Sequence, residues 1–198
     1  DIVNFKNIFT PLDLFYFRKD GKENYLAKVK NGLNNTTEWT YKKLTSESTY
    51  YKRGNLDAYP VNNIQLPFLS VSEFKSENGI GGNLTQQYSY EGLKLHRAGK
   101  GLLGFSKITT TNTTLGTRTI DENEYNSAYY TILPNKSSVF LTSNNSLISE
   151  TILTNTLVAA GTKRFWPKTT AVTQNDALAG VTTSTSLEYD TYANVTKQ

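Results

Sequence analysis

The sequence lacks cysteine and methionine entirely, and its 198 residues include a single histidine, His96. Without cysteine, the chain can form neither a disulfide framework, nor a thiolate nucleophile, nor a cysteine-based zinc site. A single histidine excludes a two-histidine mechanism and a histidine-rich metal site. Because methionine is absent even from position 1, we expect the sequence to be a piece of a longer protein. A cysteine-free composition is also compatible with secretion.

Charge and hydropathy exclude two further classes of protein. The formal net charge is +4 and the isoelectric point is near 9.1, yet lysine and arginine are scattered along the chain rather than gathered in one segment. Nucleic-acid binding usually needs a basic stripe with interleaved aromatic residues, so we expect no nucleic-acid partner. No apolar run is long enough to span a membrane and no signal-peptide pattern is present, so we expect any targeting signal to lie outside this sequence.

Aromatic and β-branched residues dominate what is present. The 13 tyrosines, 9 phenylalanines and 2 tryptophans make up 12% of the chain, threonine and asparagine are abundant, and the mean hydropathy is −0.49. Tyrosine suits a half-buried sheet, because its ring packs while its hydroxyl reaches water or a partner. Abundant polar residues provide the outer face of an antiparallel sheet that is solvated on one side. The composition therefore favours an all-β protein.

Short strand-like segments alternate with turn signals along the whole chain. Asn31-Gly32 predicts a tight hairpin, because both residues tolerate a positive φ, and further hairpins are predicted around Asn78–Asn83 and Asn112–Gly116. The predicted strands are Leu12–Phe17, Tyr25–Lys30, Thr36–Tyr41, Phe68–Lys75, Leu84–Tyr90, Ile108–Thr111, Thr117–Glu124, Val139–Thr142, Leu147–Val158, Lys163–Thr170 and Val181–Tyr189. We therefore predict an all-β fold of antiparallel strands and hairpins, in a single region over residues 1–198.

Two segments are predicted to depart from this pattern. Asp121–Tyr130 is the one place where we expect a helical turn, ended by Leu133-Pro134. Asn55–Pro67, which contains Pro60 and Pro67, is predicted to be an irregular connection. We expect at most a weak subdivision of the region near residues 55–67.

The segment from Tyr88 to Phe105 contains a glycine pattern with two interpretations. Gly99, Gly101 and Gly104 match the spacing G-x-G-x-x-G, which binds a dinucleotide when it precedes a helix. Here the pattern is followed by a β-branched run, Ser-Lys-Ile-Thr-Thr-Thr, with low helix propensity and no apolar repeat at helical spacing. The segment therefore indicates a strand, a glycine-containing turn and another strand, and we expect no cofactor.

Acidic residues and the one histidine do not form a convincing reactive group in the sequence. Paired carboxylates such as Glu188 and Asp190, or the cluster of Asp121, Glu122 and Glu124, can perform acid–base chemistry or bind calcium. Glu188 and Asp190 would share one strand face, but nothing nearby supplies the apolar pocket that would raise one pKa. A solvated face is the favoured interpretation, so we assign no catalytic and no metal-binding residue.

Several motifs resemble the middle region of the B subunits of bacterial insecticidal toxin complexes and related Rhs, or YD-repeat, proteins. In that family, a Tyr-x-Tyr-x-Gly strand precedes a glycine-rich turn and strand, as Tyr88, Tyr90 and Gly92 precede Gly101, Gly104 and Phe105 here. Later elements of the family are matched by Tyr125 and Leu133-Pro134, and the Asn-Gly hairpin is matched upstream. The end of the chain, with Tyr189, Asp190 and Asn194, is similar to a YD repeat. Ala193 stands where the family usually has glycine, which argues against a left-handed turn there.

The resemblance implies a structural and non-enzymatic role. In the family, strands wind into a hollow shell that encloses a toxin region until delivery, so the implied partners are the rest of the parent polypeptide and its enclosed cargo. The implied location is secreted or at the bacterial cell surface. The family's self-cleaving aspartate site lies in motifs that this chain does not contain, so no catalytic residue is carried over. The aromatic and glycine residues of the matched motifs are expected to form the architecture.

A carbohydrate- or protein-binding β-module, as in an adhesin, is the alternative function. Exposed aromatic rings are good platforms for sugars, and Trp39 and Trp166 are the candidate platform residues. The two functions differ in what they require of these residues. If both tryptophans share one exposed face, sugar binding gains support, and if both are buried, it loses its best residues.

Overall fold

The computed structural model of the chain describes residues 2–5, 14–17, 25–55, 57–161 and 164–197. Every regular element in these ranges is a β-strand. All strand pairs are antiparallel except the short parallel pair between β5 and β9. The predicted all-β, antiparallel fold is therefore confirmed. The start of the predicted strand Leu12–Phe17 and the start of Lys163–Thr170 lie outside the described residues.

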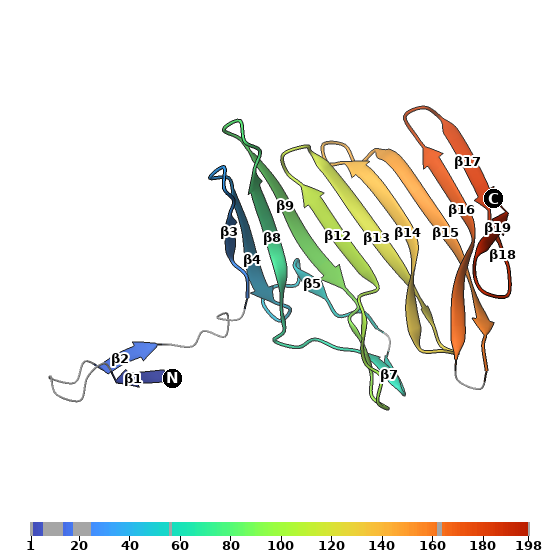
Figure 1. Cartoon of the computed structure of the whole chain (residues 1–198), viewed down its shortest axis with the longest axis horizontal. Coiled ribbons are helices and arrows are strands. Elements are labelled where there is room, and N and C mark those ends of the chain that lie inside the picture. Colours follow the sequence, from blue (N-terminus) through green and yellow to red (C-terminus); the bar gives the residue numbers. More distant parts are fainter. Residues whose placement is uncertain (1, 6–13, 18–24, 56, 162–163, 198) are drawn as a thin grey trace.

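The dominant element is an 11-stranded sheet (Figure 1). Its strands follow one another almost in chain order, so most neighbours are joined by hairpins. From one edge to the other, the order is β17 (Val181–Ser186), β16 (Phe165–Asp176), β15 (Leu147–Ala159), β14 (Thr131–Leu141), β13 (Thr117–Asn126), β12 (Lys107–Asn112), β9 (Asn83–Glu91), β8 (Leu69–Glu77), β4 (Thr36–Lys43) and β3 (Lys28–Lys30), and β5 (Tyr51–Lys52) pairs with β9.

Three smaller sheets accompany the large one. A four-stranded sheet lies at the lower end in Figure 1 and has the order β11 (Gly101–Gly104), β10 (Lys94–His96), β7 (Val61–Asn63) and β6 (Asp57–Ala58). Two hairpins form the others, β1 (Ile2–Phe5) with β2 (Leu14–Phe17), and β18 (Glu188–Tyr189) with β19 (Val195–Lys197). The chain enters the four-stranded sheet twice, before β8 and after β9, and returns to the large sheet each time.

The hairpins predicted around Asn78–Asn83 and Asn112–Gly116 are present, whereas the first hairpin has a different turn. Register pairs Lys30 with Thr36, so the loop spans residues 31–35 instead of two residues. The side chain of Asn31 accepts hydrogen bonds from the backbone N–H groups of Leu33 and Asn35, and the positive φ falls on Asn34, at 67°. The asparagine side chain, rather than the Asn-Gly dipeptide, organises this turn.

The predicted helical turn in Asp121–Tyr130 is wrong, because this segment is committed to the sheet. Strand β13 runs to Asn126 and pairs with both β12 and β14, so its backbone groups are used in two ladders. The predicted irregular connection Asn55–Pro67 is also only partly irregular. Within it, β6 and β7 pair with each other, and β7 pairs with β10, so the segment forms part of the four-stranded sheet.

Several ladders of the large sheet contain β-bulges, where one strand has an extra residue. The register shifts between Glu122 and Asn123, between Val139 and Phe140, and between Thr154 and Asn155, which leaves an extra residue on β14, β15 and β16 respectively. A further shift between Thr40 and Tyr41 places the extra residue, Ser72, on β8. Bulges bend the bulged strand and increase its twist, so they account for departures from a flat sheet.

Hydrophobic burial is confined to one end of the fold. The buried hydrophobic residues among those described are Leu44, Tyr50, Tyr51, Val61 and Leu93. None of them lies in β12–β17, where the strands run side by side and most side chains on both faces are half-buried (Figure 1). Among the described residues, the larger part of the sheet is therefore a single layer without a second layer packed on it.

The terminal hairpin contains a tight turn built on Asp190. Its carboxylate accepts hydrogen bonds from the backbone N–H groups of Tyr192 (2.8 Å) and Asn194 (2.9 Å) and from the Asn194 side chain (2.9 Å). These hydrogen bonds lower the pKa of Asp190, and the bond from the Asn194 side chain has the largest effect. Ala193 adopts φ of 69°, so the left-handed turn forms although glycine is absent. The turn that alanine put in doubt is therefore present, and the hydrogen bonds to Asp190 hold it.

Replacing Ala193 by glycine should stabilise the terminal hairpin. A left-handed φ costs alanine about 1 kcal/mol that glycine avoids, although part of this is offset by the greater freedom of glycine in the unfolded chain. We expect slower amide hydrogen exchange in β18 and β19. Ala179→Gly, in the turn before β17 and without a positive φ, is the control and should speed local exchange. Equal effects of both changes would contradict the role of the strained turn.

Candidate functional site

The aromatic–glycine motif builds the junction between the two sheets. Tyr90 at the end of β9 and Phe105 before β12 have ring centroids 4.7 Å apart. Tyr50 meets Tyr90 edge-on at 5.7 Å, and Tyr51 meets Phe105 edge-on at 6.4 Å. Such pairs contribute about 0.5–1.5 kcal/mol each beyond the area they bury. This aromatic junction, together with Leu44 and Leu93, forms the core.

At the junction, strands β8 and β9 separate and two tyrosines fill the opening. The β8–β9 ladder ends at the pair Glu73–Gln87, close to the bulge at Ser72. Beyond it, β9 pairs with β5 instead. The hydroxyl of Tyr50 donates to the carbonyl of Ser70 (2.8 Å), and the hydroxyl of Tyr90 donates to the carbonyl of Val71 (2.8 Å). We call this opening the fork, and two carbonyls of β8 beside it accept hydrogen bonds from tyrosine hydroxyls.

Gly92 is the residue at which the chain leaves β9 for the four-stranded sheet. Its φ is +65°, and a Cβ at this position would lie 1.9 Å from the hydroxyl oxygen of Ser106. Its N–H donates to the carbonyl of Lys52 (2.8 Å), and its carbonyl accepts from the Ser106 hydroxyl (3.0 Å). Both the backbone conformation and the close approach of Ser106 therefore require glycine here.

Two titratable side chains of β10, Lys94 and His96, are buried in the four-stranded sheet. The Lys94 ammonium donates to the side chains of Asn63 (3.1 Å) and Ser106 (3.1 Å) and lies 5.9 Å from the Tyr125 ring centroid. Burial lowers the pKa of Lys94. His96 stacks on Tyr130 with centroids 4.7 Å apart, and its Nδ1 accepts from the backbone N–H of Lys100 (3.3 Å). His96, the single histidine of the sequence, is therefore a buried residue and not a surface residue in a turn.

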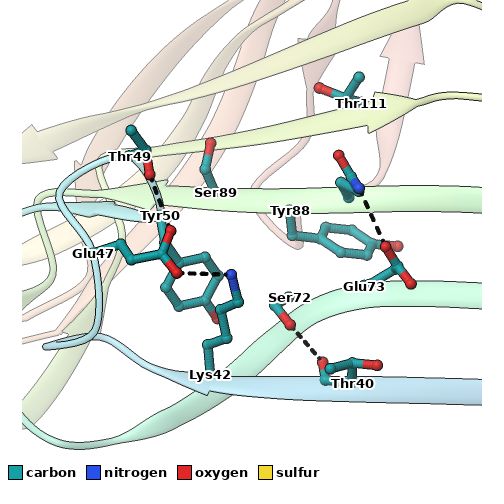
Figure 2. Close-up of a pocket in the computed structure, with 11 residues that line it drawn as sticks. Thr40, Lys42, Glu47, Thr49, Tyr50, Ser72, Glu73, Tyr88, Ser89 and Thr111 are labelled. Atoms are coloured by element: carbon teal, nitrogen blue, oxygen red, sulfur yellow. Dashed lines mark hydrogen bonds and ion pairs between the residues drawn. The ribbon is translucent and has the colours of Figure 1, made fainter.

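A polar cavity of about 340 Å³ lies in the fork, and we call it the fork cavity. Figure 2 shows its walls, with Glu73 and Tyr88 on one side and Lys42, Glu47 and Tyr50 on the other. The Gln87 amide donates to the Glu73 carboxylate (3.2 Å), and Lys42 pairs with Glu47 (3.1 Å). Its remaining lining residues carry hydroxyl groups, namely Thr40, Thr49, Ser72, Ser89 and Thr111.

A second cavity adjoins the first and has a different charge. It measures about 300 Å³, shares Thr49 and Ser89 with the fork cavity, and is lined by the basic side chains of Lys52, Lys107 and Arg118 with Glu91 as their one acidic neighbour. Lys107 pairs with Glu91 at 2.7 Å. The two cavities are therefore electrostatically distinct, although they lie side by side.

Charged side chains continue across the sheet from this second cavity. Glu91 and Lys107 are followed by Glu122, Lys136 and Glu150 on successive strands. Lys136 lies 4.0 Å from Glu122 and 2.8 Å from Glu150, and the hydrogen bond with Lys136 lowers the pKa of Glu150. Half-exposed pairs of this kind contribute little individually. Together they give this face of the sheet a solvated, polar character.

The candidate sugar-platform residues do not come together. Trp39 lies on β4, where it packs against Phe74 with centroids 5.8 Å apart, and Trp166 lies on β16 beneath the Lys168 ammonium at 4.6 Å. Six strands separate β4 from β16 in the sheet order, which corresponds to about 33 Å at the usual strand spacing. Both rings are half-buried. They cannot form one binding surface.

The motif residues chosen from the sequence are distributed over four places. Tyr90, Gly92 and Phe105 meet in the aromatic junction, and Tyr88 lines the fork cavity. Gly101 and Gly104 bound strand β11 of the four-stranded sheet. Tyr189, Asp190 and Asn194 form the terminal hairpin, where the Tyr189 hydroxyl donates to the carbonyl of Thr169 (2.8 Å). No helix follows the G-x-G-x-x-G residues, which belong to this sheet and its turn.

Sequence reasoning missed the residues that complete the junction. Tyr50, Tyr51 and Asn63 reach the junction from other segments, whereas Lys94 lies within the motif segment and Ser106 directly follows it. The adjacent pair Tyr50-Tyr51 was the available signal, because two consecutive large aromatic side chains need burial and partners for their hydroxyls. The long-range partners themselves follow only from the topology.

Among the described residues, no group of three or more histidine, aspartate and glutamate side chains is placed to hold a metal ion. The same residues contain no helix with the length and apolarity to cross a membrane.

The family comparison addresses the resemblance directly. The family model of the insecticide toxin TcdB middle/N-terminal region matches residues 16–136, more than half of the chain. The chain belongs to this family. No curated protein matches the chain.

The TcdB middle-region match includes the fork, the aromatic junction and the four-stranded sheet. It also includes Tyr125 and Leu133-Pro134, and it ends within β14. The resemblance to a toxin-complex B-subunit middle region is therefore confirmed. The YD-like terminal hairpin lies beyond residue 136, so its relation to YD repeats stays a prediction.

Substitution of Gly92 should be much more damaging than substitution of another left-handed glycine. Gly92→Ala adds the strain of φ +65° and a clash with Ser106, whereas Gly101→Ala adds only strain, since nothing lies within 4 Å of its Cβ position at φ +75°. We expect a loss of about 3 kcal/mol for Gly92→Ala and about 1 kcal/mol for Gly101→Ala in chemical unfolding. Similar losses for both variants would show that the Ser106 contact is unimportant.

The junction should weaken at alkaline pH. Burial, with a smaller contribution from Tyr88, raises the pKa of Tyr90 to about 12, and burial also raises the pKa of Tyr50. An unfolded tyrosine ionises near pH 10, so stability is fully present below about pH 10 and falls as the pH rises toward about 12. Tyr90→Phe should give a shallower decline in the free energy of unfolding over this range.

The control for this experiment is Tyr59→Phe, because Tyr59 is 79% exposed. Tyr59→Phe should leave unchanged the decline of the free energy of unfolding between about pH 10 and about pH 12. The comparison separates the contribution of Tyr90 from that of lysine titration. At neutral pH, Tyr90→Phe should cost about 1 kcal/mol through the lost bond to Val71. An unchanged slope in Tyr90→Phe would contradict the buried position of this hydroxyl.

Proposed function

We propose that this toxin-complex segment is a non-enzymatic wall element, whose strands form part of a β-shell that encloses and delivers a toxin polypeptide. Its partners would be the rest of the parent polypeptide and the enclosed cargo, and its place of action would be outside the producing cell. Family membership supports the toxin-complex context. The wall role rests on the structural observation that follows.

The observation that carries the proposal is the single-layer sheet. Independent domains normally pack two layers around a hydrophobic core. Here, strands β12–β17 contribute no buried hydrophobic residue to the described part of the chain, and the core is restricted to the aromatic junction. A broad sheet with such a small core is suited to being part of a larger wall, where neighbouring strands supply its stability.

The polar face of the sheet supports the same role. The charged row from Glu91 to Glu150 and the abundant threonine side chains give one face a polar character from β9 to β15, where it can contact water. A layer meant to pack beneath a second sheet would instead present continuous apolar residues. A wall between two aqueous spaces needs no such covering layer.

Edge strands provide the connection to neighbouring wall segments. Strand β17 lies at one edge of the large sheet and β3 at the other, and nearly all their side chains are exposed. Edge strands present unpaired backbone groups that accept a further strand. In the parent protein, adjoining segments would pair with these edges and extend the sheet.

Size-exclusion chromatography with light scattering and a thermal melt of the 198-residue chain test this proposal. Removed from its neighbours, a wall segment should self-associate through its edges or fail to melt cooperatively. A monomer with a cooperative melt would instead identify an autonomous β-domain and would contradict the wall role.

Lysine on the edge strand should suppress this association. Val181, the first residue of β17, is 54% exposed, and Val181→Lys places a charge where a second strand would pair. We expect a shift toward monomer in light scattering with little change in melting temperature. The matched control is Leu178→Lys, a similar change at a 76% exposed position in the preceding turn, which should leave association unchanged. Equal effects of both variants would point to general surface hydrophobicity instead.

A further inference from the structure

We propose that the fork cavity is a binding site for a neutral saccharide of one or two pyranose rings. The wall function does not assign any ligand to this cavity, and the proposal does not depend on that function. It also differs from the sugar platform predicted at Trp39 and Trp166, because neither tryptophan lines the cavity.

Unused hydroxyl groups are the first reason. Within the described part of the chain, the side-chain hydroxyls of Thr40, Ser89 and Thr111 have no hydrogen-bond partner, and all three residues line the cavity. Each hydroxyl can donate one bond and accept two. A ligand with many hydroxyls of its own matches such a lining, since every group can act as donor or acceptor.

The paired Glu73 and Gln87 provide directed polar contacts. The Gln87 amide holds the Glu73 carboxylate through a 3.2 Å hydrogen bond, so both planar groups lie together in the lining of the cavity. The carboxylate retains acceptor positions, and the amide retains one N–H and its carbonyl oxygen. Hydrogen bonds from sugar hydroxyls to a carboxylate are stronger than those to neutral acceptors.

Tyr88 supplies an aromatic surface at the same place. Its hydroxyl is held by the Gln86 side chain at 2.8 Å, which restrains the ring, and burial raises the pKa of this tyrosine. Tyr88 is one of the residues that line the cavity, and Figure 2 shows its ring beside Glu73. An amphipathic ring of this kind can pack against the C–H face of a pyranose while polar groups bind its edge.

Charge selects a neutral ligand over an anion. Lys42 and Glu47 neutralise each other at 3.1 Å, which leaves the Glu73 carboxylate as the remaining charge in the lining. A phosphate or carboxylate ligand would be repelled here, whereas the neighbouring cavity with Lys52, Lys107 and Arg118 would attract it. The two cavities can therefore be distinguished by the charge of the probe.

The fork is shaped to stay open. The bulge at Ser72 directly adjoins the last β8–β9 pair, Glu73–Gln87, and the hydroxyls of Tyr50 and Tyr90 bind the carbonyls of Ser70 and Val71. These carbonyls are therefore not available for an inserted peptide strand. A volume of about 340 Å³ is within the range of small-molecule sites and suits one or two sugar rings.

Ligand-observed NMR titration of the 198-residue chain tests the proposal. The probes are the methyl glycosides of glucose, galactose, mannose and N-acetylglucosamine, together with maltose, and glucuronic acid and inorganic phosphate serve as anionic comparisons. We expect at least one neutral probe to bind with a millimolar or lower dissociation constant, and we expect glucuronic acid to bind several-fold more weakly. Absence of binding by every neutral probe to folded chain would overturn the proposal.

Variants that preserve the fold locate the site. Ser89→Ala and Thr111→Val remove hydroxyls without protein partners, so they should leave the melting temperature unchanged and weaken binding several-fold. Glu73→Gln and Tyr88→Leu should each weaken it by about tenfold. The matched controls are Thr156→Val, an exposed strand threonine on β15, and Glu124→Gln, an exposed glutamate on β13, and both should bind as the original chain does.

Two results would assign binding elsewhere and overturn the proposal. One is an unchanged affinity in all four cavity variants. The other is tighter binding of glucuronic acid or phosphate that is lost in Lys107→Gln, because this would identify the basic cavity as the site.

Discussion

The hydroxyl groups of Tyr50 and Tyr90 are the contacts on which the arrangement of the two sheets depends. By donating to the carbonyls of Ser70 and Val71, they allow β8 and β9 to separate without leaving buried backbone groups unpaired. That separation gives room for β5 to pair with β9 and for the chain to enter the four-stranded sheet at Gly92. The aromatic core and the fork cavity both arise from this one opening. Stability and the candidate binding site therefore share the same residues.

The molecule has two parts that differ in how deeply their side chains are buried and in what stabilises them. At the aromatic junction, side chains are buried and each glycine or tyrosine has specific contacts. Across β12–β17, stability comes from backbone ladders and half-exposed cross-strand pairs, which are individually weak. The family match covers the whole junction and ends within β14. The segment recognised by the family model is thus the one with the most demanding packing.

Local signals in the sequence were sufficient for the strands and for most hairpins. Period-two patterns and asparagine- or glycine-containing turns are local properties, so the pairs around Asn78–Asn83 and Asn112–Gly116 could be predicted. The helical turn at Asp121–Tyr130 was predicted wrongly, because local propensity is overridden when two neighbouring ladders need the same backbone. Buried His96 and Lys94 could not be anticipated, since their partners Tyr130, Asn63 and Ser106 come from distant segments. The fork cavity depends on a bulge, which leaves no clear local signal.

The bulges have a consequence for how the strands of this sheet can change in length during evolution. Loss of one residue from a regular strand moves every following side chain to the opposite face of the sheet. Loss of the extra residue at a bulge, such as Asn135 on β14 or Thr170 on β16, restores a regular ladder and leaves the remaining side chains on their original faces. The bulged positions are therefore places within strands where single-residue deletions can be accommodated. A related sequence of different length can in this way keep both faces of the sheet, although its strands have different numbers of residues.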